Sequence, residues 1–440
     1  MRPWTAWRAR CARPVPRRAA LGAVLLTAAC AAALTPTTDD VAPGDVAPGD
    51  AAARVIRVAL SSAPSARISA TGEWRMYDTG GESTLLRAGG GDVWTVQTQR
   101  GSAYLRAVRA DGVPTEHRPG PFVARPLARG TLITLDGTPY RGELALIPTD
   151  TGMLIVNRLS LEDYLRGVLP REVGPRTIHE RAAIEAMAVA ARSYAVVRIA
   201  GDVMRPYDIR SRDLDQVYGG ASTETALTDE AVAATEGLVL TYGGRVVSAP
   251  YHSTCGGSTA AASEIWQRTP DQPYLRAVSD RVPGTDRYYC DASPRYRWET
   301  TMDRATLAAN LGRYLRAYAT LPGGGAPGTA RNIVPEGATP TGRVRTLVVT
   351  TDRGRFTLRG NDIRFVMRTP SGALLNSTYF TVESERAADG ALTRVTFRGS
   401  GWGHGVGMCQ WGAFGRARAG QDFRTILRTY YPGTTVEPLD

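Results

Sequence analysis

The segment LPREVGPRT places one acidic side chain, Glu172, in a setting suited to acid–base chemistry. A helix is expected to stop at Pro170 and another to start shortly after, so we expect Glu172 to project from a connecting turn. Apolar groups surround it, namely Pro170, Val173 and Pro175. Partial removal from water would raise the pKa of this carboxyl group and let it hold a proton near neutral pH. The plain alternative is a surface glutamate in a loop.

Two further segments carry polar side chains of interest. The glycine-rich stretch GWGHGVGMCQWGA, residues 401–413, contains His404 and Gln410, and glycine at this density lets a backbone approach a ligand closely. Its two tryptophans could stack on sugar faces or lie in a core. A phosphate loop is disfavoured because no Gly-Lys-Ser/Thr sequence follows. The stretch DLDQVYGG, residues 213–220, holds Gln216 and Tyr218 in an expected loop.

The cysteines of the region after residue 250 allow three interpretations. Zinc could be held by cysteine and histidine side chains, namely His252, Cys255 and Cys290 with Cys409 or His404 as a fourth ligand. A Cys255–Cys290 disulfide is the alternative that export favours, and we expect it over zinc. A nucleophilic Cys255 beside His252 is the third, and no orienting partner lies nearby in the sequence.

The first 33 residues are typical of an export signal. Arginines precede the apolar run AALGAVLLTAACAAAL, which is too short to span a membrane. LTAAC resembles a lipobox, which would make Cys30 a lipidated first residue, whereas Ala31–Ala33 would end an ordinary signal peptide. Residues 34–53, with the repeat VAPGDVAPGD, are predicted to be a flexible linker. We expect an exported protein of the cell envelope or the extracellular space, with membrane contact only through this signal or a lipid anchor.

Composition and charge limit the classes of function that the chain could have. The chain is 43% hydrophobic and 22% charged, which is typical of a globular protein. Its net charge is +11, and subtracting the six arginines of residues 1–30, a stretch without acids, leaves +5. A charge of that size suits work near an anionic cell envelope. Nucleic-acid binding is disfavoured, because no arginine stripe with interleaved aromatics occurs.

The elements that must position these residues begin with strands. Short β-type runs separated by glycine and aspartate turns predict a β-rich region over residues 54–157. From residue 158 the pattern becomes mixed. Ser160 caps a short helix, and the pair Thr177–Glu180 is a capping box for a second one that ends before Gly201.

Alanine dominates this second helix, so we expect a buried central helix. A third helix is expected from Thr228 to Gly237, then a hairpin that turns at Gly243–Gly244. Residues 300–318 look helical, RVRTLVVTTDRGRFTLRG is another hairpin, and a short helix, FRTILRTYY, lies near the end. We therefore predict an α+β fold with a β-rich N-terminal region, 54–157, and a mixed α/β region, 158–440, that contains the central helix and a groove.

Several segments together resemble the SpoIID/LytB family, the stage II sporulation protein D group. The matching segments, in the family's order, are SLEDYLRGVLPREV, AIEAMAVAARSYAV, DQVYGG, YHSTCGGST, GNDIRFVMR and GWGHGVGMCQWGAFG. The resemblance covers roughly residues 54–436. The family includes lytic transglycosylases that act on glycan strands stripped of their stem peptides. It implies that the region 158–440 is catalytic and that Glu172, in the segment LPREV, is the catalytic acid.

That reaction needs only one carboxyl group, whereas most glycosidases need two. The glutamate donates its proton to the glycosidic oxygen and then takes the proton of the sugar's own 6-hydroxyl, which closes an anhydro ring. The resemblance also implies groove residues, each of which could instead be scaffold: Arg192, Tyr194, Gln216, Tyr218, Tyr251, His252, Ser253, His404 and Gln410. For Arg192 and Tyr194 the scaffold alternatives are a buried ion pair and a core phenol.

The resemblance bears on cofactors and partners as well. Some relatives bind zinc near the segment matching 252–290, but only part of such a ligand set occurs there in this chain, so we expect no cofactor and keep the disulfide. Peptidoglycan glycan is the expected partner. Part of the family enhances a partner amidase, so the rival interpretation is a non-enzymatic glycan-binding module. A zinc hydrolase built on His252, Cys255 and Cys290 is a third class.

Overall fold

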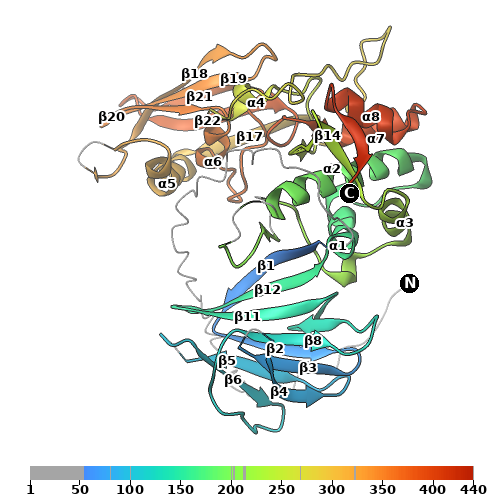
Figure 1. Ribbon diagram of the computed structural model, residues 1–440. Helices are drawn as coiled ribbons and strands as arrows, with labels where there is room; N and C mark the ends of the chain where they lie inside the picture. The colour runs from blue at the N-terminus through green and yellow to red at the C-terminus, as the bar shows by residue number, and fades with distance from the viewer. Residues whose placement is uncertain are drawn as a thin grey trace, which may run out of the picture. The chain divides into compact units, whose positions relative to one another are not determined.

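The computed structural model describes residues 54–79, 81–99, 101–199, 201, 204–211, 215–267, 269–321 and 324–439. The expected export signal, the linker and Cys30 lie outside the described residues. Figure 1 shows helices together with several sheets, which confirms the predicted α+β class. In the described part of the chain, no helix is long and apolar enough to cross a membrane.

Strands fill the N-terminal region, drawn in blue to cyan in Figure 1. One sheet has the order β13-β1-β12-β11-β8-β3-β4 and the other β10-β9-β2-β5-β6-β7. Apolar side chains of both sheets share one core, which includes Ile68, Trp74, Phe122 and Leu144. The strands are β1 (Val55–Ala63), β2 (Ser65–Ala70), β3 (Trp74–Asp78), β4 (Ser83–Ala88), β5 (Trp94–Thr98), β6 (Tyr104–Arg109), β7 (Arg118–Pro119), β8 (Phe122–Pro126), β9 (Ile133–Leu135), β10 (Thr138–Tyr140), β11 (Glu143–Thr149), β12 (Gly152–Ser160) and β13 (Ile209–Arg210).

The central helix α2 (Arg181–Ile199) is buried, as its alanine content predicted. Its small side chains let five elements approach it closely, and it packs against α1, α3, α7, α8 and β14. These are α1 (Leu161–Val173), α3 (Ala226–Ala234), α7 (Gln410–Arg418), α8 (Phe423–Tyr430) and β14 (Leu238–Tyr242). Two apolar clusters lie on either side of α2, one around α1 and β1 and one around α7 and α8.

Helix α1 differs from its prediction at the point that matters for Glu172. The helix does not stop at Pro170 but continues to Val173, so Glu172 lies in its last turn. Packing explains the difference, because Leu169 and Val173 are buried and a proline near the helix end removes only one hydrogen bond. Gly174, at φ +66°, then ends the helix. The expected capping box is present: Thr177 N–H donates to Glu180 Oε2 at 2.9 Å.

A parallel pair of short strands joins two of the motifs. Strand β16 (Tyr251–His252) pairs with β23 (Met408–Cys409), so His252 lies beside Cys409. The expected hairpin turns at Gly243–Gly244, where β14 meets β15 (Arg245–Val246), and β24 (Thr435–Pro438) pairs with the other edge of β14. The short elements of this region are η1 (Ile178–Glu180), η2 (Ala221–Thr223) and α4 (Ala262–Ile265).

Residues 297–400 form two three-stranded sheets around a core of their own. The helix expected over 300–318 begins later, because Thr300 and Thr301 belong to a strand that pairs with β22 and Asp303 caps the helix α5. The expected hairpin is present as β19 and β20. The elements are β17 (Arg297–Asp303), α5 (Arg304–Tyr314), η3 (Leu315–Ala317), β18 (Ala330–Ala338), β19 (Val344–Thr351), β20 (Gly354–Arg359), α6 (Asp362–Val366), β21 (Phe380–Arg386) and β22 (Leu392–Ser400).

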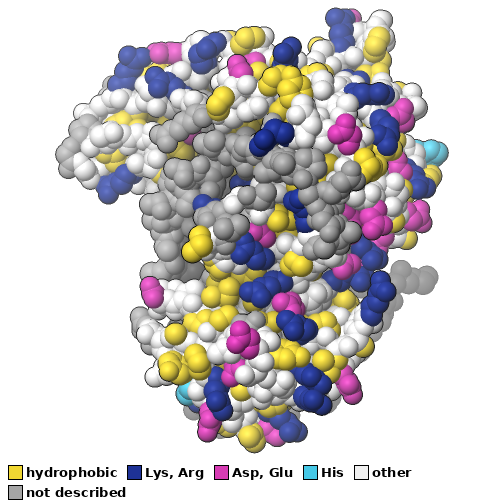
Figure 2. All heavy atoms as spheres, viewed as in Figure 1, with side chains coloured by type: hydrophobic (Ala, Val, Ile, Leu, Met, Phe, Trp, Pro, Cys, Tyr) yellow, Lys and Arg dark blue, Asp and Glu magenta, His cyan; other side chains and the backbone are white. Residues whose placement is uncertain are grey.

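Charged side chains of both signs are interspersed on the face shown in Figure 2. Many arginines lie against acids, for example Arg141 Nε at 2.7 Å from Glu224 Oε1 and Arg166 Nη2 at 2.6 Å from Asp229 Oδ2. Such pairing reduces the positive potential that a polyanion would need for tight binding.

Candidate active site

Three segments far apart in the sequence meet at the carboxyl group of Glu172. The side chain is half-buried at the end of α1. Its Oε1 accepts a hydrogen bond from the backbone N–H of Val217 at 2.9 Å. Gln410 Nε2 lies 3.4 Å from Oε2 and 3.3 Å from the Glu172 carbonyl oxygen. The segments LPREV, DQVYGG and GMCQWGA therefore converge on one carboxyl group.

The turn after α1 is tied to α7, which keeps the end of α1 in place. Arg176 Nε donates to the carbonyl oxygen of Val173 at 2.8 Å. The Arg176 guanidinium lies 4.0 Å from the ring centre of Phe414 and 4.8 Å from that of Trp411. Cation–π contacts of this kind fix a guanidinium over an aromatic face. The same helix α7 carries Gln410, so one helix contacts both Glu172 and the turn that follows α1.

Gln216 holds the loop that presents the Val217 N–H. Its side chain is 1% exposed. Its Oε1 accepts from the Tyr164 hydroxyl at 2.9 Å, and its Nε2 donates to the Tyr251 hydroxyl at 3.1 Å and to the Ala191 carbonyl at 3.2 Å. Gln216 thus bridges α1, α2 and β16, and acts on Glu172 through the position of the next residue.

Two neutral phenols, those of Tyr164 and Tyr251, lie near this carboxyl group. Burial, followed by the charge of Glu172, raises the pKa of Tyr251 well above its usual range. Burial also raises the pKa of Tyr164, with smaller contributions from Asp215 and Glu172. Both hydroxyls therefore stay protonated. The Tyr164 hydroxyl donates its proton to Gln216 Oε1, whereas the Tyr251 hydroxyl accepts from Gln216 and can donate its own proton to another acceptor.

His252 and His404 are neutral, and both rings form hydrogen bonds with the protein backbone. His404 Nδ1 accepts from the Val406 N–H at 3.1 Å, which leaves Nε2 to donate to the Tyr251 carbonyl at 2.9 Å. His252 Nδ1 lies 3.1 Å from the Val406 carbonyl, to which it donates. Burial lowers the pKa of His404 to about 3 and that of His252 well below its usual range. The pair ties the glycine-rich segment to β16 and supplies no proton near neutral pH.

The remaining expected groove residues have protein partners. Arg192 is fully buried, and two of its nitrogens each lie 2.7 Å from a Glu162 oxygen, which is the scaffold arrangement considered for it. Tyr194 donates to Asp215 Oδ1 at 3.1 Å. Tyr218 donates to Asn157 Oδ1 at 2.8 Å. The Ser253 carbonyl accepts from the Trp411 N–H at 3.0 Å, beside Gln410.

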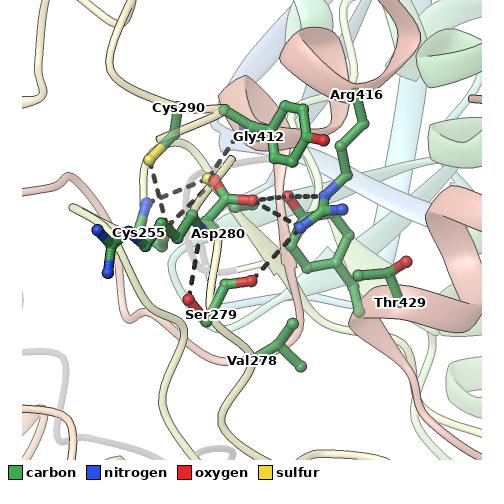
Figure 3. A network of polar contacts seen from close by, with 12 residues as sticks. Cys255, Val278, Ser279, Asp280, Cys290, Gly412, Arg416 and Thr429 are labelled. Carbon is green, nitrogen blue, oxygen red and sulfur yellow. Dashed lines mark hydrogen bonds and ion pairs between the residues drawn. The ribbon is translucent and has the colours of Figure 1, made fainter. Parts of the chain in front are cut away.

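A second cluster lies next to Gln410. Cys255, Asp280, Cys290 and Cys409 are all buried, and their Sγ and carboxylate oxygen atoms lie within 4.8 Å of one another. The Sγ atoms of Cys255 and Cys290, for which the sequence predicts a disulfide, lie 3.4 Å apart in the structure, and a disulfide bond is about 2.05 Å long. Figure 3 shows Asp280 between the sulfur atoms and Arg416.

The pKa values of the four side chains in this cluster are shifted in different directions. Hydrogen bonds from Cys255 and Cys409 lower the pKa of Cys290. Burial raises the pKa of Cys255 and of Cys409, and it raises the pKa of Asp280 to about 8. Neither histidine considered as a zinc ligand belongs to the cluster, because the contacts of both rings lie with Val406 and Tyr251.

The sequence did not predict two groups of this region, the Val217 N–H beside Glu172 and the Asp280 carboxyl group in the cysteine cluster. The Val217 N–H is a backbone group, which no residue type reveals. Asp280 is a single acid in a loop of ordinary composition, 25 residues after Cys255 and 10 before Cys290, and only its order between two cysteines could have drawn notice.

Comparison with known sequences gives two family matches. The family described as Stage II sporulation protein (SpoIID) matches residues 149–242, which include Glu172 and Gln216. A domain of unknown function (DUF8618) matches residues 284–407.

Individual relatives cover much of the chain. Stage II sporulation protein D of Bacillus subtilis is 33% identical over 301 residues, 65% of this chain and 76% of that protein. An uncharacterized protein of Brachyspira hyodysenteriae is 31% identical over 305 residues, 69% of this chain and 73% of that protein. The amidase enhancer of Bacillus subtilis is 31% identical over 298 residues, 62% of this chain but only 40% of that protein.

Proposed function

Because this chain belongs to the SpoIID family of stage II sporulation proteins, we propose that it is a lytic transglycosylase of the bacterial cell wall. Family membership and the similarity to an amidase enhancer support a role in the cell wall, and hence a place in the cell envelope or outside the cell. The proposed substrate is the glycan strand of peptidoglycan, stripped of its stem peptides, and the product ends in an anhydromuramyl sugar.

The observation that carries this proposal is the held carboxyl group of Glu172. In the first step Glu172 donates its proton to the glycosidic oxygen, and the bond from that oxygen to the muramyl C1 breaks. In the second step the Glu172 carboxylate takes the proton of the 6-hydroxyl as that oxygen bonds to C1. No water enters, so a second carboxylate to activate water is not needed.

The neighbours of Glu172 suit both steps. The Val217 N–H, 2.9 Å from Oε1, stabilises the carboxylate that forms when the proton leaves. The Gln410 amide, 3.4 Å from Oε2, also favours the carboxylate over the protonated acid. A carboxyl group fixed at both oxygens needs little reorganisation during proton transfer, which lowers the barrier.

The test is product analysis on purified glycan strands. The wild-type protein should release anhydro-ended fragments, identified by mass, from strands without stem peptides. Glu172→Gln should lower the rate by about 10²- to 10⁴-fold, the usual range for a general acid–base group. Glu236→Gln, the same change at an exposed position, is the matched control and should keep the wild-type rate. Absence of anhydro products, or a Glu172→Gln variant as fast as the control, would refute the proposal.

The second candidate function is enhancement of a partner amidase, which the similarity to the amidase enhancer favours. In that case the same surface binds glycan and Glu172 is one contact among several. Incubation with a cell-wall amidase separates the two functions. Stimulation of the amidase that is undiminished in Glu172→Gln supports enhancement without catalysis by this chain, whereas stimulation that needs Glu172 supports the transglycosylase.

A further inference from the structure

Four potential metal ligands from separate segments meet behind the glycine-rich loop. Cys255 follows β16, Asp280 and Cys290 lie in the loop that precedes β17, and Cys409 ends β23. All four side chains are fully buried. Thiolates and a carboxylate are ligands that zinc accepts, and buried sites with four protein ligands are typical of structural zinc.

The distances fit a tetrahedral ion. With zinc–sulfur bonds of about 2.3 Å, two thiolates of a tetrahedral site lie about 3.8 Å apart, and a thiolate and a carboxylate oxygen lie about 3.6 Å apart. Cys255 Sγ lies 3.4 Å from Cys290 Sγ and 3.6 Å from Asp280 Oδ2. The four donor atoms lie within 4.8 Å of one another, so closing onto an ion requires shifts of about 1 Å.

Backbone N–H groups already point at the sulfur atoms. Cys409 Sγ accepts from the N–H of Cys255 at 3.2 Å and of Gly412 at 3.3 Å. Cys255 Sγ accepts from the N–H of Gly257 at 3.4 Å. Such donors stabilise thiolates over thiols, because a hydrogen bond to a charged acceptor is stronger than one to a neutral acceptor.

A further set of contacts orients Asp280 (Figure 3). Its Oδ1 accepts from the Tyr430 hydroxyl at 2.6 Å and from Arg416 Nη2 at 3.3 Å, which turns Oδ2 toward the sulfur atoms. Arg416 Nε also donates to the Tyr430 hydroxyl at 3.2 Å. Partners of this kind fix the orientation of a ligating carboxylate in metal sites.

The positive charges of two nearby arginines, Arg343 and Arg416, also favour a negatively charged metal site. Zinc with three thiolates and one carboxylate has a net charge of about −2, as in a four-cysteine site with the same ion. Arg416 compensates part of it. Arg343 is 1% exposed, and its guanidinium donates to the carbonyl oxygens of Cys255 and Ser258. Burial lowers the pKa of Arg343, and the nearby charges of Cys255 and Glu264 act against that shift, so a negatively charged cluster would stabilise this buried guanidinium.

We infer that Cys255, Asp280, Cys290 and Cys409 bind one zinc ion in a closed structural site. The thiol and carboxyl protons that the four side chains still carry are released to solvent on binding, and no ligand position is left for water or substrate. His252 and His404 are not ligands. Because Cys409 directly precedes Gln410, the ion also fixes the Gln410 amide against Glu172; this consequence rests on the proposed function, whereas the metal site does not.

The experiment measures metal in the full chain, purified without chelators. Elemental analysis should find about one zinc ion per chain. Replacement by Co²⁺ should give thiolate-to-cobalt charge-transfer absorption and the strong visible bands of tetrahedral coordination. Alkylation mapped by mass spectrometry should modify the three cysteines only after the metal is removed. All of these readouts are taken without substrate, so they stand apart from the outcome of the transglycosylase test.

Variants separate ligands from neighbours. Cys290→Ser should lose zinc, and Asp280→Cys, which restores four strong ligands, should keep it even if Asp280→Ala does not fold. Tyr430→Phe should weaken zinc binding by about 10- to 100-fold, the range for loss of a group that orients a ligand. His252→Gln is the matched control and should bind zinc as the wild type does.

Three results would overturn the inference. The first is a metal-free chain with a Cys255–Cys290 disulfide-linked peptide. The second is a chain with three freely alkylated thiols that takes up no Co²⁺. The third is loss of zinc in His252→Gln with retention in Cys290→Ser, which would place the ion on other ligands.

Discussion

At the scale of single residues, Gln410 tests how the carboxyl group of Glu172 is held. Gln410→Met keeps the length of the side chain and removes the amide that lies 3.4 Å from Oε2. Loss of a hydrogen bond to a charged group costs about 1.5–3 kcal/mol, so the catalytic rate should fall by about 10- to 100-fold. Because the amide contacts the Glu172 carboxyl group, KM should change less than kcat.

Steady-state kinetics on glycan strands without stem peptides measures the effect of Gln410→Met. Gln99→Met, the same change at an exposed position just after β5, serves as control. A rise in KM at unchanged kcat would assign Gln410 to glycan binding instead.

The burial of His404 predicts how the free energy of unfolding depends on pH. Burial lowers its pKa to about 3 when folded, whereas histidine in an unfolded chain titrates near about 6.5. Between these values the unfolded state binds a proton that the folded state does not. His404 therefore costs the wild type about 1.4 kcal/mol of unfolding free energy for each pH unit below about 6.5.

His404→Gln removes that dependence. The variant should be less stable than the wild type at neutral pH, because it loses the paired contacts with Val406 and Tyr251, and its deficit should shrink as the pH falls. Denaturant unfolding at several pH values between about 7.5 and about 4.5 measures both curves. His179→Gln, at an exposed position, controls for residue type. Parallel curves for wild type and His404→Gln would contradict the assignment of a neutral buried His404.

Part of the candidate site could be predicted from the sequence. The order of the motifs singled out Glu172, Gln216 and Gln410, and the structure brings all three segments together. The side chain of Gln216, however, is buried among Tyr164, Ala191 and Tyr251. The direction in which the Gln216 side chain points depends on how α1, α2 and β16 pack. The spacing of residues along the chain does not contain that information.

At the scale of elements, the hairpins and the capping box follow from local turn and cap chemistry, and the sequence was sufficient for them. Helix α7 was missed because its glycines look like loop residues. The structure gives another reason for them: a Cβ on Gly412 would lie 2.1 Å from the Tyr430 hydroxyl, and one on Gly415 would lie 2.1 Å from the Tyr289 carbonyl. These glycines serve close packing between elements, which only the tertiary structure reveals.

The end of α1 gives an element-scale prediction. Gly174 has φ +66° and ψ −169°, a conformation that side chains disfavour, and a Cβ there would meet no atom within 4 Å. Gly174→Ala should therefore cost about 1–3 kcal/mol through the backbone alone. Because Glu172 lies two residues earlier, relief of this strain shifts the last turn of α1 and lowers the activity per folded molecule.

A matched change separates the two effects of Gly174→Ala. Gly237, between α3 and β14, has φ +69° and also meets nothing within 4 Å. Gly237→Ala should lower the melting temperature while the activity per folded molecule stays at the wild-type value. Equal losses of activity in both variants would show that α1 geometry has no special role.

At the scale of the whole molecule, the N-terminal sheets and the region that carries Glu172 should unfold as one unit. Strand β1 pairs with β12 in the N-terminal sheet, and Ile56 and Val58 of β1 also pack in the cluster around α1. Tyr218, in the loop beside Val217, donates to Asn157 of β12 at 2.8 Å. Buried contacts of this kind couple the stability of the two regions.

Tyr218→Phe tests this coupling. The change removes one buried hydrogen bond and leaves Asn157 Oδ1 without its donor, so the free energy of unfolding should fall by about 1–3 kcal/mol. The variant should still unfold in a single transition, at a lower midpoint, that far-UV and near-UV circular dichroism report equally. A single transition is expected because neither region keeps the shared core when the other unfolds. Tyr104→Phe, on the exposed part of β6, controls for loss of a hydroxyl. Two separate transitions, with only the second one shifted, would show instead that the N-terminal sheets fold independently and that the loop at Val217 is set by α1 and α2 alone.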